Sequence, residues 1–251
     1  GMRGSLEVAR NELSTANFAK SLSVKKIIVN SSELENQLLS EGKKQENIFF
    51  VPNIFEKKYS LMQEQDFLAI RKFLRTKLGI RENDVIIAGA GRYTPEKDFH
   101  FFLDVVERII PIFPSVKILL IGQCVIFFEP IINNKNIKDR FILMGETDNV
   151  HDLLPATDIF FLSSKSEGMP NILLEAIDAG CIPVATNLGG VRDILGDSEL
   201  IIGTERNPAK TAEMIGKLIE SGGFVNQSHR THLERFTAEK IMPIYMNCLL
   251  P

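Results

Sequence analysis

The chain has 251 residues, which is long enough for one large domain and part of a second. Hydrophobic residues make up 44% of it and charged residues 24%, and no apolar run reaches the roughly 18 residues that a membrane span needs. The formal net charge is -3, with Lys and Arg dispersed among acids, so the chain lacks the basic surface that nucleic acid binding requires. We expect a soluble globular protein that binds no nucleic acid.

The cysteines and the start of the chain indicate its compartment. Cys124, Cys181 and Cys248 are odd in number and widely spaced in apolar surroundings, which is typical of free thiols in a reducing environment. The chain does not open with a signal-peptide pattern, and we interpret Gly1-Met2 as a protease-cleavage scar before a start methionine. These features predict a cytoplasmic protein.

The chain opens with a helix-strand-helix pattern. Residues 5–21 are amphipathic enough for one helix, residues 26–30 read as a strand, and residues 31–40 follow as a second helix. A regular array of elements begins after this segment, and the change of pattern near residue 45 is the only sign of a boundary. The expected divisions are 1–45, 46–235 and 236–251.

Beyond residue 45, short runs of Ile, Val, Leu and Phe alternate with helical segments, as in repeated βα units around a parallel sheet. The expected strands are residues 48–51, 85–88, 117–121, 140–144, 158–162, 182–185 and 200–202. The expected helices are residues 61–77, 99–110, 171–178, 190–195, 209–220 and 238–249, and Pro243 should kink or break the last. Most strands are apolar throughout, which indicates helices on both faces. The predicted fold class is α/β, a doubly wound, Rossmann-like parallel sheet of about six strands.

Ligands of such sheets bind at the carboxyl ends of the strands, so the residues after each strand are the candidates. Gly89-Ala90-Gly91-Arg92 follows one strand, and Lys97 comes shortly after it. The glycines let a ligand approach the backbone closely, and the two cations can donate to phosphate oxygens. Taken singly, Arg92 and Lys97 are more often solvated surface charges, and Gly-x-Gly without a third glycine is weak evidence for a dinucleotide site.

A stronger candidate follows the strand at 158–162. Gly168 permits a tight turn, Pro170 suits the first turn of a helix, and the backbone N–H groups near Gly168, Met169 and Asn171 should point toward an anionic or hydroxyl-rich ligand. Glu167 and Glu175 are the only acids in this apolar stretch, and a buried carboxylate needs a partner.

Two interpretations of these glutamates stay open. In the first, Glu175 accepts hydrogen bonds from ribose hydroxyls while Glu167 contacts a sugar. In the second, Glu175 pairs with a nearby Arg or Lys and only completes the packing. The presence of Arg92 and Lys97 at the end of another strand favours a binding site.

The remaining signals are weaker. Gly189 and Gly190 form a third strand-to-helix turn, where glycines commonly serve only the turn geometry. The four histidines are scattered, no set of His, Cys and acids has metal-ligand spacing, and no metal is predicted. Neither a Gly-x-Ser-x-Gly elbow nor a phosphate-binding Walker loop occurs, which removes the main support for hydrolase and P-loop functions.

With these motifs in place, the sequence resembles the large retaining family 4 of the GT-B fold glycosyltransferases. The most specific element is Glu167-Gly168-Met169-Pro170-Asn171 through Glu175, which matches the family's Glu-x7-Glu motif. Residues 179–186, Gly189-Gly190, Gly91-Arg92 with Lys97, and Val51-Pro52-Asn53 support it. The resemblance runs from about Lys25 to the C-terminus.

The resemblance implies a site for a nucleotide diphosphate sugar such as a UDP- or GDP-hexose, with no other cofactor. Arg92 and Lys97 would hold the diphosphate and stabilise it as it leaves, in place of a metal, with retention of anomeric configuration. Glu175 would bind the ribose, and Glu167 with the backbone of Gly168 to Asn171 would bind the sugar. In addition, backbone near Leu143 and Met144 would meet the base. Arg92, Lys97 and Glu167 are thus the expected catalytic residues; the expected substrate-binding residues are Gly91, Leu143, Met144, Gly168, Met169, Pro170, Asn171, Glu175, Gly189 and Gly190.

The sequence departs from the family in two ways. Asn53-Ile54 stands where the family usually has Asn-Gly, and of the N-terminal acceptor domain only a remnant at 1–45 is recognisable. We expect the isolated chain to bind donor weakly and to transfer no sugar. The apolar face of the opening segment should be covered by the main domain, a partner chain or a second copy, and the missing half could also contact a membrane. The alternatives are a non-catalytic nucleotide-sugar-binding subunit that needs a partner chain and, with less support, a sugar-nucleotide epimerase.

Overall fold

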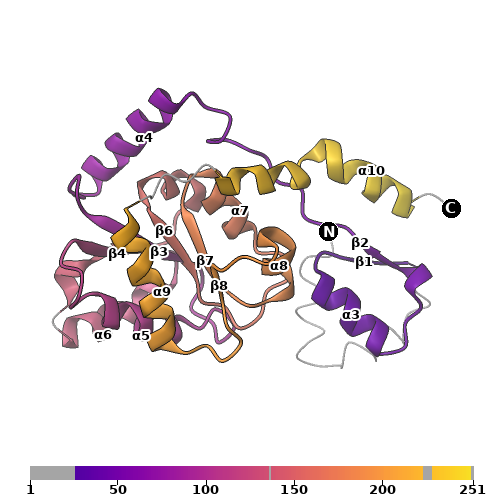
Figure 1. The fold of residues 1–251 in the computed structure, drawn as a ribbon, viewed down its shortest axis with the longest axis horizontal. Coiled ribbons are helices and arrows are strands. Elements are labelled where there is room, and N and C mark those ends of the chain that lie inside the picture. The colour runs from indigo at the N-terminus through magenta and orange to yellow at the C-terminus, as the bar shows by residue number, and fades with distance from the viewer. Residues whose placement is uncertain (1–25, 136, 223–227, 250–251) are drawn as a thin grey trace.

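The computed structural model describes residues 26–135, 137–222 and 228–249. The predicted helix at 5–21 and Gly1-Met2 lie outside these ranges. Six parallel strands form the main sheet, in the order β5-β4-β3-β6-β7-β8, and Figure 1 labels all of them except β5. Their bounds are β3 Val85–Ala90, β4 Val116–Ile121, β5 Phe141–Met144, β6 Ile159–Leu162, β7 Ile182–Thr186 and β8 Ile201–Ile202. The predicted α/β class and doubly wound parallel sheet are confirmed.

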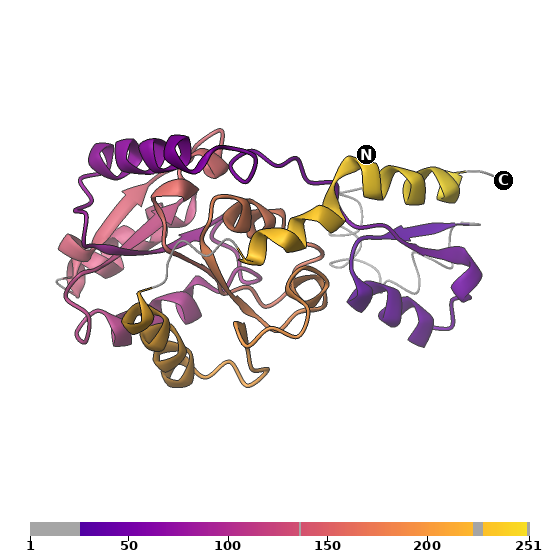
Figure 2. The same ribbon diagram turned by 45° about the horizontal axis from the view of Figure 1, so that its top comes forward.

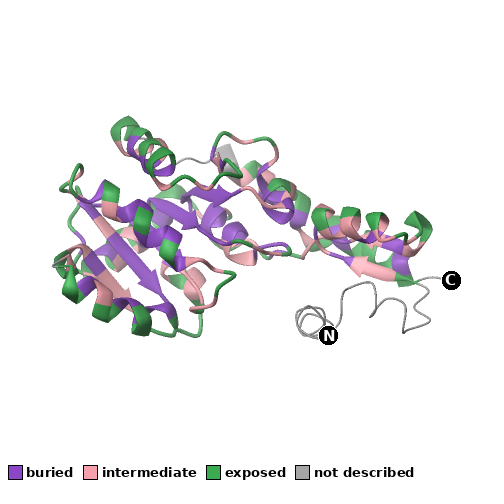
Figure 3. Ribbon diagram, turned by 90° about the horizontal axis from the view of Figure 1, so that it is seen from below, coloured by how far each residue is buried: buried purple, intermediate pink, exposed green. Residues whose placement is uncertain are grey.

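Helices cover both faces of this sheet because its strands are apolar on both sides. Val85 and Ile87 of β3 pack with α5 (Phe99–Ile109), α6 (Cys124–Asn134) and α9 (Pro208–Ser221). Ile86 and Ala88, which point the other way, pack with α4 (Glu64–Lys77), α7 (Asn171–Asp178) and α8 (Gly189–Leu195). Figure 3 shows the result as a buried central sheet with exposed outer helix surfaces. The core therefore lies in two layers, one on each face of the sheet.

Short 3-10 helices occupy several connections and complete the chain. They are η1 Gln45–Asn47, η2 Lys138–Arg140, η3 Val150–Asp152, η4 Leu154–Ala156 and η5 Ser228–Phe236. Within the described ranges, none of the helices combines the length and apolar character needed to cross a membrane.

The opening part of the described chain is a separate βαβ unit. It consists of β1 (Ile27–Val29), α3 (Ser32–Ser40) and β2 (Ile48–Phe50), and β1 pairs only with β2, in parallel. The expected division between residues 45 and 46 would separate β2 from this partner strand. We propose that the main domain begins after Phe50 instead.

The C-terminal helix α10 (Ala238–Leu249) packs on the opening unit. Ile241 and Cys248 are 2% and 3% exposed and contact Val51, with Ile28 and Phe49 packed against them. The other face of the two-stranded sheet packs on α3 through Val29, Leu38 and Ile48. Figure 2 shows α10 beside β1 and β2, away from the main sheet. Pro243 lies inside α10 and does not end it.

Candidate functional site

The strand order places one end of the sheet where a ligand would bind. Numbered within the main sheet, the order is 3-2-1-4-5-6, and the direction of winding reverses between β3 and β6. In folds of this class the loops on either side of that reversal diverge and leave a crevice. The loop after β3 contains Arg92 and Lys97, and the loop after β6 contains Glu167. The structure therefore brings the two predicted motifs to the same crevice.

Lys97 and Glu167 meet across this crevice. The Lys97 Nζ lies 2.6 Å from Glu167 Oε1, and the Ser164 Oγ donates to the same oxygen at 2.7 Å. The lysine and glutamate side chains are 25% and 15% exposed, so the pair is only partly accessible to water. An ammonium group has three donors and a carboxylate two oxygens, so each partner keeps capacity for a ligand.

Two glycines bring the loops after β3 and β4 together. Gly91 has a φ of 145°, in the region that favours glycine, and its carbonyl oxygen accepts from the Cys124 N–H at 3.2 Å. A Cβ on Gly122 would lie 2.8 Å from that oxygen, so a side chain there would displace the loop. Close approach of these two backbones explains the glycine at both positions.

A pocket of about 320 Å³ opens beside these glycines. Its lining residues are Gly91, Arg92, Gly122, Gln123, Glu146, Thr147, Asp148 and Val150. Arg92 is exposed, and no hydrogen bond or ion pair joins its guanidinium to the part of the chain that the structure describes. Its guanidinium therefore keeps all its donors for an anion in this pocket.

Leu143 and Met144, predicted to meet the base, lie at the end of the edge strand β5 but do not line this pocket. The Met144 carbonyl oxygen accepts from the Gly122 N–H at 2.9 Å. The pocket wall on this side comes instead from residues 146–148, which follow β5. Contact of Leu143 and Met144 with a base stays a prediction.

Glu175 is the clearest candidate for a ligand contact. It is half-buried on α7, and burial raises the pKa of its carboxyl group, an effect that His151 partly offsets. Neither a hydrogen bond nor an ion pair to another described residue satisfies this carboxylate. The ion pair with Arg or Lys that would give Glu175 a purely structural role is therefore not seen among those residues. A carboxylate in this state takes its hydrogen bonds from water or from a ligand.

The start of α7 borders the same crevice. Pro170 is the N-cap residue, one position before the first helical turn where we expected it, and no side chain caps the helix. The Asn53 Nδ2 donates to the Met169 carbonyl oxygen at 3.2 Å and to the Asn171 Oδ1 at 2.7 Å. The polar side chain of Asn171 is thus used within the protein, whereas the first backbone N–H groups of α7 have no capping side chain.

Gly189 and Gly190 have structural partners. The Gly189 N–H donates to the Glu33 Oε2 of the opening unit at 2.9 Å. A Cβ on Gly190 would lie 1.6 Å from the Gly168 carbonyl oxygen, so only glycine lets α8 pack against this loop. These contacts give the glycines a role in close packing, in addition to the turn geometry expected from the sequence, and their contact with a substrate stays a prediction.

Sequence reasoning missed the residues that hold the loops from behind. Arg206 donates to the carbonyl oxygens of Ser163 and Ser164 at 2.7 and 2.8 Å and to Asp98 Oδ2 at 2.6 Å. Asp98 in turn caps α5 by accepting from the Phe101 N–H at 3.4 Å. The capping position of Asp98 could have been recognised, because an aspartate directly before a helical pattern is a common N-cap. Arg206 gave no such signal, since it reaches the site from beyond β8.

Two histidines of the described chain contact neighbouring polar side chains. The His151 Nε2 lies 3.1 Å from the buried Asp178 Oδ2, and the Tyr93 hydroxyl lies 2.6 Å from the His100 Nε2. His151 packs edge-on against Tyr59 at 5.0 Å between ring centroids. Both contacts are consistent with packing roles for these rings.

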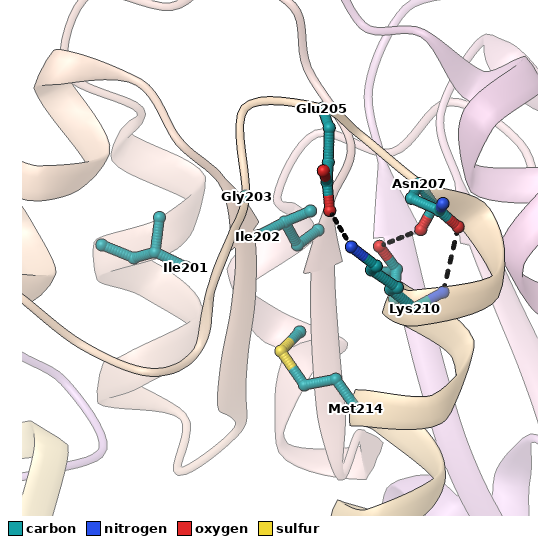
Figure 4. Close-up of a pocket in the computed structure, with 8 residues that line it drawn as sticks. Ile201, Ile202, Gly203, Glu205, Asn207, Lys210 and Met214 are labelled. Atoms are coloured by element: carbon teal, nitrogen blue, oxygen red, sulfur yellow. Dashed lines mark hydrogen bonds and ion pairs between the residues drawn. The ribbon is translucent and has the colours of Figure 1, made fainter.

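A second pocket lies away from the crevice, between β8 and the start of α9. It measures about 120 Å³, and its polar groups bind one another (Figure 4). Lys210 pairs with Glu205 at 2.6 Å, and the Asn207 Oδ1 accepts from the N–H of Ala209 and Lys210. The polar groups of this pocket therefore already have partners, and the crevice is the better candidate site.

Comparison with known proteins places this chain in a family. Residues 70–237 match the family described as Glycosyl transferases group 1. N-acetyl-alpha-D-glucosaminyl L-malate synthase of Bacillus anthracis is 29% identical over 183 residues, which cover 68% of this chain and 47% of that protein. UDP-Gal:alpha-D-GlcNAc-diphosphoundecaprenol alpha-1,3-galactosyltransferase of Escherichia coli is 29% identical over 118 residues, covering 45% and 30%. The chain thus spans half the length of these relatives or less.

A solved structure shows the same fold. HepE of Anabaena, in complex with UDP and glucose, superposes with a TM-score of 0.76 at 19% identity, over 93% of this chain and 65% of that one. On the family match over residues 70–237, the chain belongs to the Glycosyl transferases group 1 family.

Proposed function

We propose that this chain binds a nucleotide diphosphate sugar in the crevice between β3 and β6 and forms the donor-binding part of a retaining glycosyltransferase. The observation that supports this most directly is the Lys97–Glu167 pair between the loops after β3 and β6, with the exposed guanidinium of Arg92 on the first of these loops. The unpaired carboxylate of Glu175 on α7, the helix that follows the second loop, adds an acceptor. A nucleotide sugar supplies an anionic diphosphate and several hydroxyl donors, which complement these groups.

Each group has a role in this proposal. Arg92 and Lys97 bind the diphosphate, and their positive charges stabilise it as the bond to the sugar breaks. Lys97 can do so while it holds Glu167, because only one of its three donors is used there. Glu167 accepts from a sugar hydroxyl through Oε2, since both of its hydrogen bonds fall on Oε1. Glu175 binds the ribose.

The donor is proposed to be a UDP-hexose or a GDP-hexose. The Escherichia coli relative is named for UDP-Gal, and HepE was solved with UDP and glucose, which favours the uridine form. The acceptor site would lie on a part of the protein outside this chain or on a partner chain, because the relatives are at least twice as long as the region matched.

The test is calorimetric titration of the chain with UDP-, GDP- and ADP-glucose, repeated with Arg92→Ala. We expect the UDP-sugar to bind most tightly and Arg92→Ala to weaken it roughly tenfold or more, since hydrogen bonds to charged groups contribute on the order of 1.5–3 kcal/mol. Arg108→Ala is the matched control, because among the described residues Arg108 donates only to the Asp104 carbonyl oxygen of its own helix. If Arg92→Ala and Arg108→Ala bind the UDP-sugar equally well, the proposed site is contradicted.

A further inference from the structure

Three asparagine side chains form a continuous chain of hydrogen bonds between the opening unit and the crevice. The Asn30 Nδ2, directly after β1, donates to the Asn53 Oδ1 at 3.3 Å. The Asn53 Nδ2 then donates to the Asn171 Oδ1 at 2.7 Å and to the Met169 carbonyl oxygen at 3.2 Å. We call Asn30, Asn53 and Asn171 the asparagine chain.

Asn53 lies at the centre of these contacts. Its backbone N–H also meets the Met169 Sδ at 3.3 Å, so both its main chain and its side chain bind the segment after β6. Asn53 belongs to the connection between β2 and α4 and is 116 residues away from Met169 in sequence. A residue of the connection between the two bodies therefore contacts the segment proposed to bind the sugar.

The segment Gly168–Asn171 depends on such external contacts for its shape. No side chain caps the start of α7, so the helix does not fix this turn by its own sequence. Gly168 packs so closely on the opening unit that a Cβ there would lie 2.8 Å from the Asn30 Oδ1. The turn is thus held between the asparagine chain on one side and Gly190 of α8 on the other.

We infer that Asn53 is a positioning residue for the sugar: it fixes the turn Gly168–Asn171, and Asn30 couples that turn to the opening unit. This inference rests on the proposed function, because it assigns the turn to the sugar and not to the nucleotide. The Arg92, Lys97 and Glu175 side chains, which serve the diphosphate and ribose, have no contact with Asn53 among the hydrogen bonds of the described chain. Asn53 should therefore matter for the sugar alone.

The experiment compares UDP-glucose with UDP for the wild-type chain, Asn53→Ala and Asn53→Asp, by calorimetric titration. Both variants remove the two donated hydrogen bonds, and a carboxylate at this position also faces two acceptors. We expect affinity for UDP-glucose to fall roughly tenfold and affinity for UDP to stay within about twofold, given the usual net contribution of two hydrogen bonds. Asn30→Ala should change UDP-glucose binding in the same direction by less. If the wild-type chain prefers guanosine ligands, GDP-glucose and GDP take the place of UDP-glucose and UDP in this experiment.

The control is Ile54→Ala, which alters the neighbouring residue, 43% exposed, and should leave both affinities unchanged. A purely structural role for Asn53 would lower the melting temperature and keep the ratio of the two affinities; that result overturns the inference. An equal loss of affinity for UDP and for UDP-glucose in Asn53→Ala would also overturn it, since the effect would then not belong to the sugar. If the wild-type chain binds neither ligand, the proposed function itself fails.

Discussion

At the scale of the residue, the half-buried carboxylate of Glu175 lowers the stability of the free protein and favours ligand binding. Burial raises the pKa of its carboxyl group, so the folded chain holds this proton more tightly than the unfolded chain does. Stability linked to this group is therefore present at low pH and is lost as the pH rises through the raised pKa. At neutral pH the ionised carboxylate destabilises the free protein, and a ligand that donates hydrogen bonds relieves this.

The variant Glu175→Gln separates the two effects. We expect nucleotide-sugar affinity to fall roughly tenfold or more, because a neutral amide replaces a charged acceptor. The melting temperature at pH 7 should stay the same or rise, since a costly charge is removed. Calorimetry and thermal unfolding measure the two quantities, and Glu220→Gln on the exposed surface of α9 is the control. A lower melting temperature with unchanged affinity would show that Glu175 has a structural partner.

At the scale of the element, Asp178 fixes the C-terminal end of α7. Its fully buried carboxylate accepts from the backbone N–H groups of Lys58, Tyr59 and Ser60 at 3.0, 2.8 and 3.0 Å. His151 adds a contact at 3.1 Å. Burial alone would raise the pKa of Asp178, but hydrogen bonds from His151, Ser60 and the backbone outweigh it and hold this pKa well below the ordinary range. These bonds tie the residues before α4 to the helix that bears Glu175.

Acid should weaken this connection. A depressed pKa in the folded state gives stability that is present above the unfolded value near 3.8 and is lost as the pH falls from there toward the folded value. Asp178→Asn should lower the free energy of unfolding by about 3 kcal/mol at pH 7, because one amide oxygen replaces two charged ones. Below about pH 4 the difference from wild type should shrink. Urea unfolding from pH 7 to pH 3 measures both, and a difference independent of pH would contradict the role of the charge.

The sequence predicted which segments form strands better than it predicted which strands pair with one another. Each strand expected from an apolar run is present, because such runs lie on a sheet covered on both faces. Propensity does not identify a strand's partner, which is why β2 was assigned to the main domain although it pairs with β1. Helix α6 was missed because Cys124–Asn134 is rich in β-branched and aromatic residues and has Pro130 inside. The motifs predicted Lys97 and Glu167, whereas Arg206 and the asparagine chain depend on contacts between distant segments.

At the scale of the whole molecule, the structure describes the wall of the crevice that would bind the donor. Transfer also needs an acceptor hydroxyl held against the anomeric carbon, and such positioning accounts for much of the rate of a bimolecular reaction. We predict that this chain alone binds donor but transfers no sugar. Transfer and donor hydrolysis are to be assayed with and without the N-terminal region of a full-length relative, supplied in cis or in trans.

Restored transfer would support the donor-binding part of an enzyme, and restored binding without transfer would support the non-catalytic subunit. Robust transfer by the isolated chain would contradict the prediction and place an acceptor site within these residues. The control for chemistry at the crevice is Lys97→Ala, introduced into whichever form of the protein transfers sugar. This variant removes the ion-pair partner of Glu167.

The two chain passages that join the opening unit to the main domain limit how these two parts can move. The chain passes from the opening unit to the main domain through residues 51–55 and returns through residues 236–238. These passages lie side by side, since the Phe55 N–H donates to the Phe236 carbonyl oxygen at 2.7 Å. Two adjacent connections of this kind act as a hinge. They permit the opening unit to rotate about one axis and oppose its sliding along, or separation from, the main domain. Movement of the opening unit relative to the main domain would then be a rotation about Phe55 and Phe236, in which the part of the opening unit farthest from these residues is displaced most and Asn53, two residues from Phe55, is displaced least.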